Sequence, residues 1–590
     1  MTTQQKDKFT PELRILAASL LSMAVIILWL KYFGPKPPLT PPQTNKPAVT
    51  ASGPMPAGGG KPDSHSTSVP AKTAANASPT PQVAVTAKSD TQERSVVIEN
   101  DLYRVEFSNR GAIVKSWQLK KYTDDAKPPR ILDVVHPHAS EQSAGWPFSI
   151  VLDDEQLQNA ANAALYQIDP AATKVASPTD ADFSWSDGHL EVTKHFHFDN
   201  SYVAHVTVAA KLDGKPITAG IAWLGGFGDL TVTNPAPWET VQTYYSEGGK
   251  VTTFLHKKLD GPDKWGAGIW QGGKDFTGIE DRYFTAAFLP ANGAAPGTLE
   301  TRYWKVSENT QAAGSTEAPT QVPVSEVATA VSGPQTALRV FVGPKDYDDL
   351  KRMNPPLHGL VNFGWLEFIA DPLFHGLKWI HGYIPNWGWA IVILTLVINM
   401  LLFPLRISSY RTQLKMQRVG PEIKAIQDKF KKYSMRDPRK AEMNKEVMAV
   451  YQREGINPVG GCFQMFLQMP IWFGLNTALR YAIEMRHARW FGWITDLSAK
   501  DPYYVLPVMM GLSMYLVSKM TPMTSTDPQQ QMMMKIMPIT MAGIFMVSPI
   551  SSGLAVYILT SSVVGIGQQW YLNRAHPVPA PVKPVRGKKS

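Results

Sequence analysis

Apolar stretches long enough to cross a lipid bilayer crowd the part of the chain that follows residue 386. A helix of roughly 20 apolar residues spans the hydrocarbon core, which is about 30 Å thick. We predict five spans there, at 387–405, 461–482, 503–520, 534–549 and 552–572. Residues 93–343 are instead mixed and polar, so the two parts of the chain are expected to work in different solvents.

A further apolar stretch stands near the N-terminus, from Ile15 to Leu30. Basic residues precede it and no small-residue cleavage site follows it, which favours an uncleaved anchor over a signal peptide. We therefore predict a transmembrane anchor at 1–33. Pro, Ala, Ser, Thr and Gly dominate residues 34–92. This composition predicts a disordered linker, because it buries too little apolar surface to offset the entropy of ordering.

Residues 93–343 contain short alternating runs such as "EVTKHFHF" and "YVAHVTVAA", separated by Gly, Asn, Asp and Pro. Alternation with a period of two is typical of β-strands. We predict a large β domain, a sandwich, over 93–343. The chain has one cysteine, so an internal disulfide is excluded and the stability of this domain must come from its core.

An amphipathic helix is predicted within 347–384, directly before the first of the five spans. Its apolar residues recur at helical spacing and are Trp365, Phe368, Ile369, Leu373, Leu377 and Ile380. A helix of this kind lies in the membrane interface. The alternative is a helix that packs on the β domain.

Residues 407–456, between the first two of these spans, predict a basic helical hairpin. Thirteen lysines and arginines stand against six acidic residues from 406 to 454, and the positive-inside rule places such a segment in the cytoplasm. Two apolar stripes mark its helices, and Asp437 and Pro438 are expected to begin the second one. Its positive charge suggests contact with lipid headgroups or ribosomal RNA, although a merely solvated face is the alternative. The candidate contact residues are Arg411, Lys415, Lys424, Lys431, Lys432 and Arg436.

Polar residues inside the predicted spans are the strongest functional signal, because polar groups in hydrocarbon are costly and face a cavity or another helix. Thr395, Asn399 and Arg406 fall on one face of the first of the five spans. Tyr557, Ser561 and Gln568 align in the same way on the last span, and the second contributes Gln468 and Arg480. Packed together, these residues would line a wet, partly cationic groove. The alternatives are hydrogen bonds between helices and, for Arg406, a side chain that reaches the headgroups.

The spans contain no pattern typical of catalysis, with neither a nucleophile and base arrangement nor a nucleotide motif. We expect no enzyme activity, no cofactor and no metal site. A groove without reactive groups indicates binding or passage.

Several strings resemble the YidC family of membrane protein insertases. They are "NPVGGCFQMFLQMPIWFGL" at 457–475, "DLSAKDPYYVLPVMMG" at 496–511, "TDPQQQMMMKIMP" at 526–538 and "SGLAVYILTS" at 552–561. "FSNRGA" at 107–112 and "GPKDYDDL" at 343–350 extend the resemblance into the polar part of the chain.

The resemblance implies a multi-domain protein of the cell inner membrane. It would combine six spans, a periplasmic β-supersandwich at 93–343, a five-span insertase core at 385–573 and a basic cytoplasmic tail at 574–590, with both termini cytoplasmic. The implied function is insertion, folding and assembly of membrane proteins through a hydrophilic groove open to cytoplasm and lipid. The implied partners are nascent membrane proteins, the Sec translocon, the ribosome and anionic lipids, with no nucleic acid other than ribosomal RNA.

Two departures from the family pattern bear on the groove. Asn399 stands where members of the family usually carry an arginine, so the groove cation is expected to come from Arg406, with Arg480 as the alternative. Ile558 stands where a second tyrosine often follows Tyr557. Attraction of acidic substrate segments therefore depends on Arg406 or, in the alternative, on Arg480.

Two other classes of function compete with an insertase. One is a transporter or envelope enzyme whose β domain binds sugar, which a pair of carboxylates in a sandwich cleft would support. The other is a structural tether between membrane and envelope, which the long linker permits but the polar residues inside the spans do not explain.

Overall fold

The computed structural model describes residues 86–577 apart from internal gaps. The gaps are 127, 143–144, 232–240, 255–269, 292–296, 309–319, 332–334, 362, 364–365, 434–436, 457–459, 523–527 and 549. The predicted anchor at 1–33, the linker up to residue 85 and the tail after residue 577 therefore lie outside the described residues. Contacts divide the chain into two compact units, Met1–Gly343 and Pro344–Ser590.

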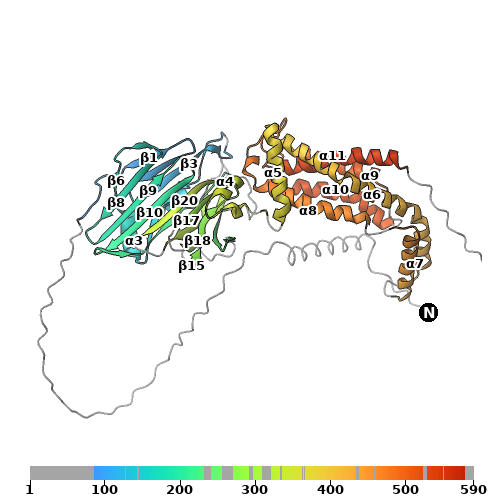
Figure 1. Cartoon of the computed structure of the whole chain (residues 1–590), viewed down its shortest axis with the longest axis horizontal. Coiled ribbons are helices and arrows are strands. Elements are labelled where there is room, and N and C mark those ends of the chain that lie inside the picture. Colours follow the sequence, from blue (N-terminus) through green and yellow to red (C-terminus); the bar gives the residue numbers. More distant parts are fainter. Residues whose placement is uncertain are drawn as a thin grey trace, which may run out of the picture. The chain divides into compact units, whose positions relative to one another are not determined.

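The first unit is built from strands (Figure 1). They are β1 (Ser95–Glu99), β2 (Tyr103–Ser108), β3 (Ile113–Thr123), β4 (Ile131–Asp133), β5 (Ser149–Leu152), β6 (Gln167–Asp169), β7 (Lys174–Ala176), β8 (Thr179–Ser186), β9 (Leu190–Phe198), β10 (Val203–Leu212), β11 (Lys215–Ile217), β12 (Ala219–Trp223), β13 (Gln242–Glu247), β14 (Lys250–Phe254), β15 (Trp270–Lys274), β16 (Phe276–Glu280), β17 (Phe284–Pro290), β18 (Gly297–Glu308), β19 (Thr320–Thr329) and β20 (Thr336–Pro344). Two short helices, α2 (Pro137–Gln142) and α3 (Glu155–Ala163), interrupt them.

Three sheets form among the described strands. The ten-stranded sheet has the order β14-β13-β16-β17-β20-β10-β9-β8-β6, with β11 paired to β10. Two five-stranded sheets have the orders β4-β3-β2-β1-β7 and β15-β18-β19-β12-β5. The predicted β-rich sandwich is thereby confirmed.

An aromatic core lies between the sheet that contains β2 and the ten-stranded sheet. Along β9 every second residue is buried, because successive side chains of a strand point to opposite faces. The ring of Phe107 on β2 meets that of Phe196 on β9 with centroids 4.9 Å apart. Trp117 on β3 meets Phe198 on β9 at 6.0 Å. Large rings from both sheets therefore supply the stability that no disulfide provides.

One buried position of β9 holds a lysine instead of an apolar residue. The side chain of Lys194 is only 1% exposed. Its Nζ donates to the carbonyl oxygens of Gly111, Ala112 and Phe148 at 2.7, 3.2 and 2.8 Å. Three acceptors require three N–H donors, which an ammonium group carries. Lys194 thus ties the turn of the "FSNRGA" string to the core.

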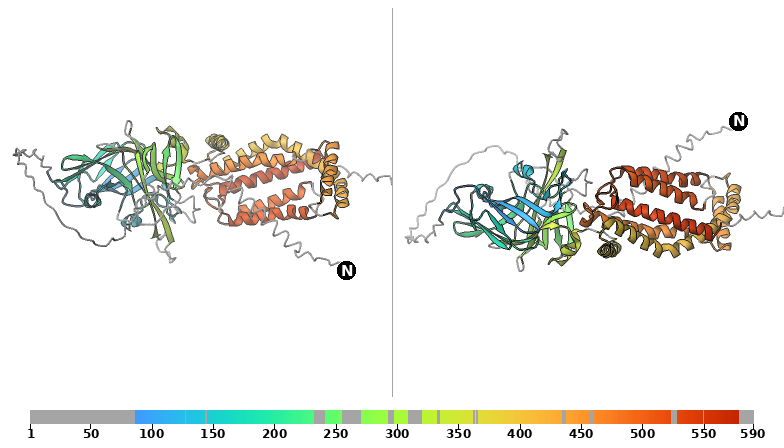
Figure 2. Two further views of the ribbon diagram at one scale, coloured as in Figure 1. Left: turned by 90° about the horizontal axis from the view of Figure 1, so that it is seen from below. Right: turned by 90° about the horizontal axis from the view of Figure 1, so that it is seen from above.

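The second unit is helical (Figures 1 and 2). Its helices are α4 (Tyr347–Arg352), η2 (His358–Leu360), α5 (Glu367–Tyr383), α6 (Trp387–Lys429), α7 (Arg439–Arg453), α8 (Gly460–Tyr481), η4 (Ile483–Met485), α9 (Val505–Met520), α10 (Pro528–Val547) and α11 (Ser552–Ala575). α11 packs against α6 and α9, α10 packs against α9, and α8 packs against α5 and α6. Figure 2 shows the long helices of this unit lying side by side.

The described helices test the predicted spans only in part. One of them, Trp387–Lys429, is both long and apolar enough to cross a membrane, and Val505–Met520 and Ile536–Val547 are shorter apolar helices. Helices occur at each of the five predicted positions. The number of spans stays a prediction.

The segment predicted as a basic helical hairpin contains the end of α6 and the whole of α7. Its first half is no separate helix, because α6 continues through Pro404 and Pro421 as one helix of 43 residues. α7 begins at Arg439, one residue later than predicted, and the Asp437 carboxylate accepts from the Arg439 backbone N–H at 3.0 Å. The two predicted stripes meet in one apolar cluster. It is formed by Val419, Ile423, Ile426, Phe430, Val450 and Ile456, with Met416, Tyr433, Met443, Val447 and Tyr451 packed against it.

The segment predicted as one amphipathic helix contains α4, the short helix η2 and α5, and Trp365 lies outside the described residues. On α5 the buried residues include Leu377 and Ile380, and the helix packs against α8 and α6 of its own unit. Phe368, with Trp379 and Tyr383, is instead exposed at 70%, 67% and 73%. α5 therefore has one apolar face inside the unit and a second, aromatic face that is exposed among the described residues.

Candidate functional site

The polar residues predicted on the first and last of the five spans meet each other where α6 and α11 pack. Thr395 is fully buried and donates to the carbonyl oxygen of Ile391 at 2.6 Å. The amide of Asn399, half-buried one turn later, donates to the carbonyl oxygen of Thr395 at 2.8 Å and to the hydroxyl of Ser561 on α11 at 3.3 Å. The hydrogen bond between helices, an alternative left open by the sequence, is present for this pair.

Arg406 continues this contact toward the C-terminal half of α6. Its guanidinium donates to Oε1 of Gln568 at 2.8 Å and to the carbonyl oxygen of Gly565 at 3.3 Å. The Gln568 amide in turn donates to the carbonyl oxygen of Asn399 at 3.2 Å. We call Thr395, Asn399, Arg406, Ser561 and Gln568 the α6–α11 polar seam. It places one half-buried positive charge among neutral hydrogen-bonding groups.

The other predicted groove residues have different surroundings. Tyr557 lies one turn before Ser561 on α11 and is buried, with 3% exposed. Gln468 and Arg480 are half-buried on α8, which packs against α5 and α6. The structure thus joins Asn399 and Arg406 of α6 to Ser561 and Gln568 of α11. Gln468 and Arg480 lie on α8, a neighbour of α6.

A second polar cluster follows the seam, and sequence reasoning missed it. The Tyr410 hydroxyl donates to Oδ1 of Asn573 at 2.8 Å, and Gln569 donates to the same oxygen at 3.0 Å. The Asn573 amide donates to the backbone carbonyl of Met520, the last residue of α9, at 3.0 Å. The signal was present in the spacing, since Tyr410 follows Arg406 by four residues and Asn573 follows Gln569 by four.

The basic residues predicted for lipid or ribosome contact lie on the outer surface of the hairpin. Those that the structure describes are exposed, and they are Arg411, Lys415, Lys424, Lys431 and Lys432. Arg436 lies outside the described residues. The Arg411 guanidinium donates to Nε2 of His576 at 3.3 Å, so it also links α6 to the residue that follows α11.

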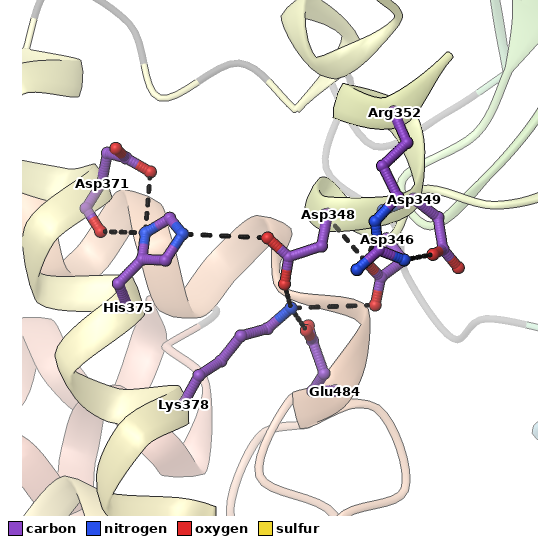
Figure 3. A network of polar contacts seen from close by, with 8 residues as sticks. All are labelled: Asp346, Asp348, Asp349, Arg352, Asp371, His375, Lys378 and Glu484. Atoms are coloured by element: carbon purple, nitrogen blue, oxygen red, sulfur yellow. Dashed lines mark hydrogen bonds and ion pairs between the residues drawn. The ribbon is translucent and has the colours of Figure 1, made fainter.

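An ion-pair cluster joins α4, α5 and η4 (Figure 3). Nζ of Lys378 on α5 lies 2.8 Å from Asp348, 2.7 Å from Glu484 and 3.8 Å from Asp346. Burial lowers the pKa of Lys378, but these facing carboxylates outweigh the burial and raise it above its ordinary value. Nearby, Nδ1 of His375 lies 3.0 Å from Asp371. One cation on α5 therefore pairs with carboxylates of two other elements, α4 with its N-cap and η4.

Comparison with known proteins identifies the family. A family model described as the 60Kd inner membrane protein matches residues 379–579, and one described as the YidC periplasmic domain matches residues 95–376. Membrane protein insertase YidC of Syntrophus aciditrophicus (strain SB) is 31% identical over 593 residues, which cover 95% of this chain and 99% of that protein. The chain belongs to the YidC family of membrane protein insertases.

A further relative agrees with this assignment. Membrane protein insertase YidC of Geotalea uraniireducens (strain Rf4) is 32% identical over 588 residues, which cover 96% of this chain and 100% of that protein. A solved structure described as an active YidC insertase with its first transmembrane domain resolved is 17% identical and has a TM-score of 0.33, covering 83% of this chain and 95% of that chain. The resemblance on which the sequence-based function rests is confirmed by the relatives' sequences.

Proposed function

We propose that this YidC-family chain inserts membrane proteins into the inner membrane and assists their folding and assembly. In this proposal the chain crosses the membrane six times, its β unit is periplasmic and both termini are cytoplasmic. Polar segments of a nascent protein enter a hydrophilic groove that contains the α6–α11 polar seam. Support comes from the family and from the position of the seam on a helix that is long and apolar enough to span a membrane.

The observation that carries the mechanism is the pairing of Arg406 with Gln568 and Gly565. A polar segment that enters dry hydrocarbon loses its hydrogen bonds to water, and that loss is the main barrier to translocation. The seam offers replacement donors and acceptors part-way across. The partners of Arg406 in the seam, the Gln568 side chain and the Gly565 carbonyl, are neutral. An acidic substrate group can therefore displace Gln568 and form a stronger, charge-assisted hydrogen bond with Arg406.

Reconstitution tests this function directly. Purified protein in liposomes that lack any other translocase is supplied with a small membrane protein whose translocated tail is acidic, and protease protection of that tail is measured. We expect protection with wild type and a severalfold loss with Arg406→Gln, which removes the charge and keeps a donor. The matched control is Arg574→Gln, because Arg574 is an exposed arginine near the end of α11.

The outcomes separate two claims. Protection no greater than that of empty liposomes, with folded and correctly oriented wild-type protein, would overturn the insertase function. Equal protection by wild type and Arg406→Gln would be consistent with the insertase function but would show that the charge of Arg406 is not needed for it. Asn399→Arg, which puts an arginine at its usual family position, is expected to restore protection in the Arg406→Gln background if the groove needs only one cation.

The exposed face of the hairpin is proposed to contact the ribosome and anionic lipids, with the Sec translocon as a further partner on larger substrates. Lys431 and Lys432 lie just after α6, in the turn that leads toward α7. Ribosome binding through phosphate contacts weakens steeply with salt, and the slope falls as contacts are removed. We expect Lys431→Glu with Lys432→Glu to lower both affinity and slope in cosedimentation with ribosomes. An unchanged salt slope would mean that these lysines face solvent and do not contact the ribosome.

A further inference from the structure

The segment between η4 and α9 contacts the first turns of both helices that form the polar seam. We call residues 488–501 of this segment the strap. The strap closes on itself, because the Leu497 backbone N–H donates to the carbonyl oxygen of Ala488 and that of Trp490 to Ile494, both at 3.0 Å. Leu497 and Ile494 are buried, with 0% and 2% exposed. The strap is therefore a folded, packed element.

Asp501 holds the end of the strap in place. Its side chain is only 2% exposed. The carboxylate accepts from the Trp493 indole N–H at 3.0 Å, from the backbone N–H of Tyr503 at 3.0 Å and from that of Leu506, on the first turn of α9, at 2.6 Å. A buried carboxylate is costly unless hydrogen bonds satisfy it. These three donors therefore fix the strap to the start of α9.

The strap also binds the start of α6 through Asn386. The side-chain oxygen of Asn386 caps α6 by accepting from the backbone N–H of Trp389 at 3.1 Å. The side-chain amide of the same residue donates to the strap carbonyl oxygens of Arg489 and Trp490 at 3.2 and 3.4 Å. One side chain thus joins the first turn of α6 to the strap.

The start of α11 is bound to the other end of the strap. The backbone N–H of Ser552 donates to the carbonyl oxygen of Ala499 at 2.7 Å, and that of Gly553 to Leu497 at 2.8 Å. A Cβ on Gly553 would lie 3.1 Å from the Leu497 carbonyl oxygen and 3.5 Å from the Ile391 side chain of α6. α6 and α11 therefore begin next to each other on the strap.

From this end onward the two helices keep one register. Three contacts between them join residues 162 positions apart, and they are Ile391 with Gly553, Asn399 with Ser561 and Arg406 with Gln568. A constant separation means that α6 and α11 run in the same direction. The contacts at the strap and the contacts of the seam therefore belong to one continuous alignment.

The seam does not determine this alignment by itself. Its polar residues repeat every seven positions on both helices, and amides and hydroxyls pair with one another in several combinations. A slip of seven residues, about 10 Å at 1.5 Å per residue, would again place polar groups opposite each other, with Asn399 facing Gln568. The strap contacts do not repeat, because only the first turn of a helix has backbone N–H groups without partners inside the helix.

We propose that the strap sets the register of α6 against α11 and so brings Arg406 and Gln568 together. Asn386 and Asp501 are positioning residues in this arrangement, since they act through the first turns of the helices and not on a substrate. The inference rests on the proposed function, in which the seam receives polar segments of a nascent protein. It assigns the strap the task of keeping that seam assembled.

The experiment measures the register by disulfide formation in full-length protein in liposomes. Cys462→Ser removes the native thiol, and Asn399→Cys with Ser561→Cys gives a reporter pair on the two helices. We expect Asn386→Asp and Asp501→Asn each to slow oxidation of this pair severalfold. Asn386→Asp keeps the oxygen that caps α6 and removes the donor to the strap. Asp501→Asn replaces one acceptor with a donor and keeps the size of the side chain.

Asp496→Asn is the matched control, because the Asp496 carboxylate accepts from the backbone N–H and hydroxyl of Ser498, at 2.7 and 2.8 Å, within the strap. Its reporter pair should oxidise at the wild-type rate. Thermal unfolding of every variant is measured alongside, and slower oxidation at an unchanged unfolding temperature separates a shifted register from a general loss of stability. Oxidation at the wild-type rate in both Asn386→Asp and Asp501→Asn would overturn the proposal.

Protease protection of a translocated tail, measured without the reporter cysteines, tests whether the register matters for insertion. We expect a severalfold loss of protection with Asn386→Asp and with Asp501→Asn, and none with Asp496→Asn. Full protection despite slow oxidation would overturn the role of the strap in insertion. Absence of protection with wild type would instead overturn the insertase function, whereas the oxidation rates judge the strap independently of it.

Discussion

At the scale of single residues, Lys194 is the most consequential polar group of the β unit. Its Nζ satisfies three buried carbonyl groups. Lys194→Met keeps the volume and removes the donors. We expect it to lower the free energy of unfolding by about 2–4 kcal/mol, because buried acceptors without partners cost about 1–3 kcal/mol each and partly recover them by relaxation. Urea unfolding of the full-length protein, followed by the fluorescence of buried tryptophans, measures the change.

Wild type and Lys194→Met are also expected to differ in how their stability changes with pH. Burial lowers the pKa of Lys194 to about 7 from an ordinary value of 10.5. Between these values the unfolded chain holds more protons than the folded one, so the stability of wild type rises with pH. Measured relative to Lys194→Met, which cannot titrate, the gain begins near pH 7 and is complete near pH 10. A difference that stays flat across this window would contradict the burial of the ammonium group.

Gly388, at the start of α6, packs closely against the segment before α9. A Cβ on Gly388 would lie 2.1 Å from the Trp490 ring. The Asn386 amide also donates to the backbone carbonyl of Arg489 at 3.2 Å. Gly388→Ala is expected to destabilise the helical unit by about 1–3 kcal/mol, because overpacking forces the ring aside. Gly382→Ala is the control, since no described residue lies within 4 Å of its added Cβ. Equal thermal stability of the two variants would show that Trp490 moves freely.

Residue patterns predicted some of these features and missed others for a physical reason. Helical spacing was enough to align Asn399 with Arg406, because their alignment is a property of one helix. Their partners Ser561 and Gln568 are 162 residues away from them, and only the packing of α11 in the folded chain decides that pairing. Alternation likewise predicted β9 as a strand, whereas the approach of Asp182 to His195 depends on the register with β8.

At the scale of elements, Lys378 connects α4, α5 and η4. Lys378→Met would leave partly buried carboxylates without their cation, and we expect a loss of about 1–3 kcal/mol in the stability of the helical unit. Lys351→Met is the control, because Lys351 is an exposed lysine on α4. Hydrogen exchange of α4 and η4 measures the effect, and equal exchange in both variants would refute a connecting role.

Acid should remove the difference in stability between wild type and Lys378→Met. The hydrogen bond from Lys378 holds the pKa of Asp348 below its ordinary value of 3.8. A lowered carboxylate pKa contributes stability above the unfolded value that is lost as the pH falls through the folded one. The gap between wild type and Lys378→Met is therefore present at neutral pH and shrinks below about pH 4.

Element boundaries followed less reliably from the sequence than element types did. We predicted that the first of the five spans ends at 405 and that the hairpin begins at 407, and Pro404 and Pro421 each remove a backbone hydrogen bond inside a helix. α6 nevertheless runs through both. Its contacts with α7, α8 and α11 supply the packing that overrides the local cost. The apolar stripes of the hairpin were predictable, because each stripe is set within one helix and the two must cover each other.

At the scale of the whole molecule, contacts and sequence similarity divide the chain at different points. The boundary between the two compact units falls between Gly343 and Pro344 in the sequence. The match to the YidC periplasmic domain instead extends to residue 376. The difference consists of α4 and most of α5. These helices belong to the helical unit by their contacts, because α5 packs on α8 and α6, and α4 supplies the Asp348 partner of Lys378.

This disagreement gives a prediction about two deletions. Removing residues 86–343 leaves α4, α5 and the Lys378 cluster intact, so we expect the remaining protein to keep the unfolding temperature of its helical unit and to insert substrate in liposomes. Removing residues 86–376 also takes away Phe374, which is buried on α5, together with Asp346 and Asp348. Gly474 of α8, where an added Cβ would lie 3.1 Å from Ile369, would lose its covering helix. The longer deletion is therefore expected to unfold at a lower temperature and to lose insertion. Equal behaviour of the two proteins would mean that α4 and α5 serve the β unit, and loss of insertion in both would make the β unit part of the insertion machinery.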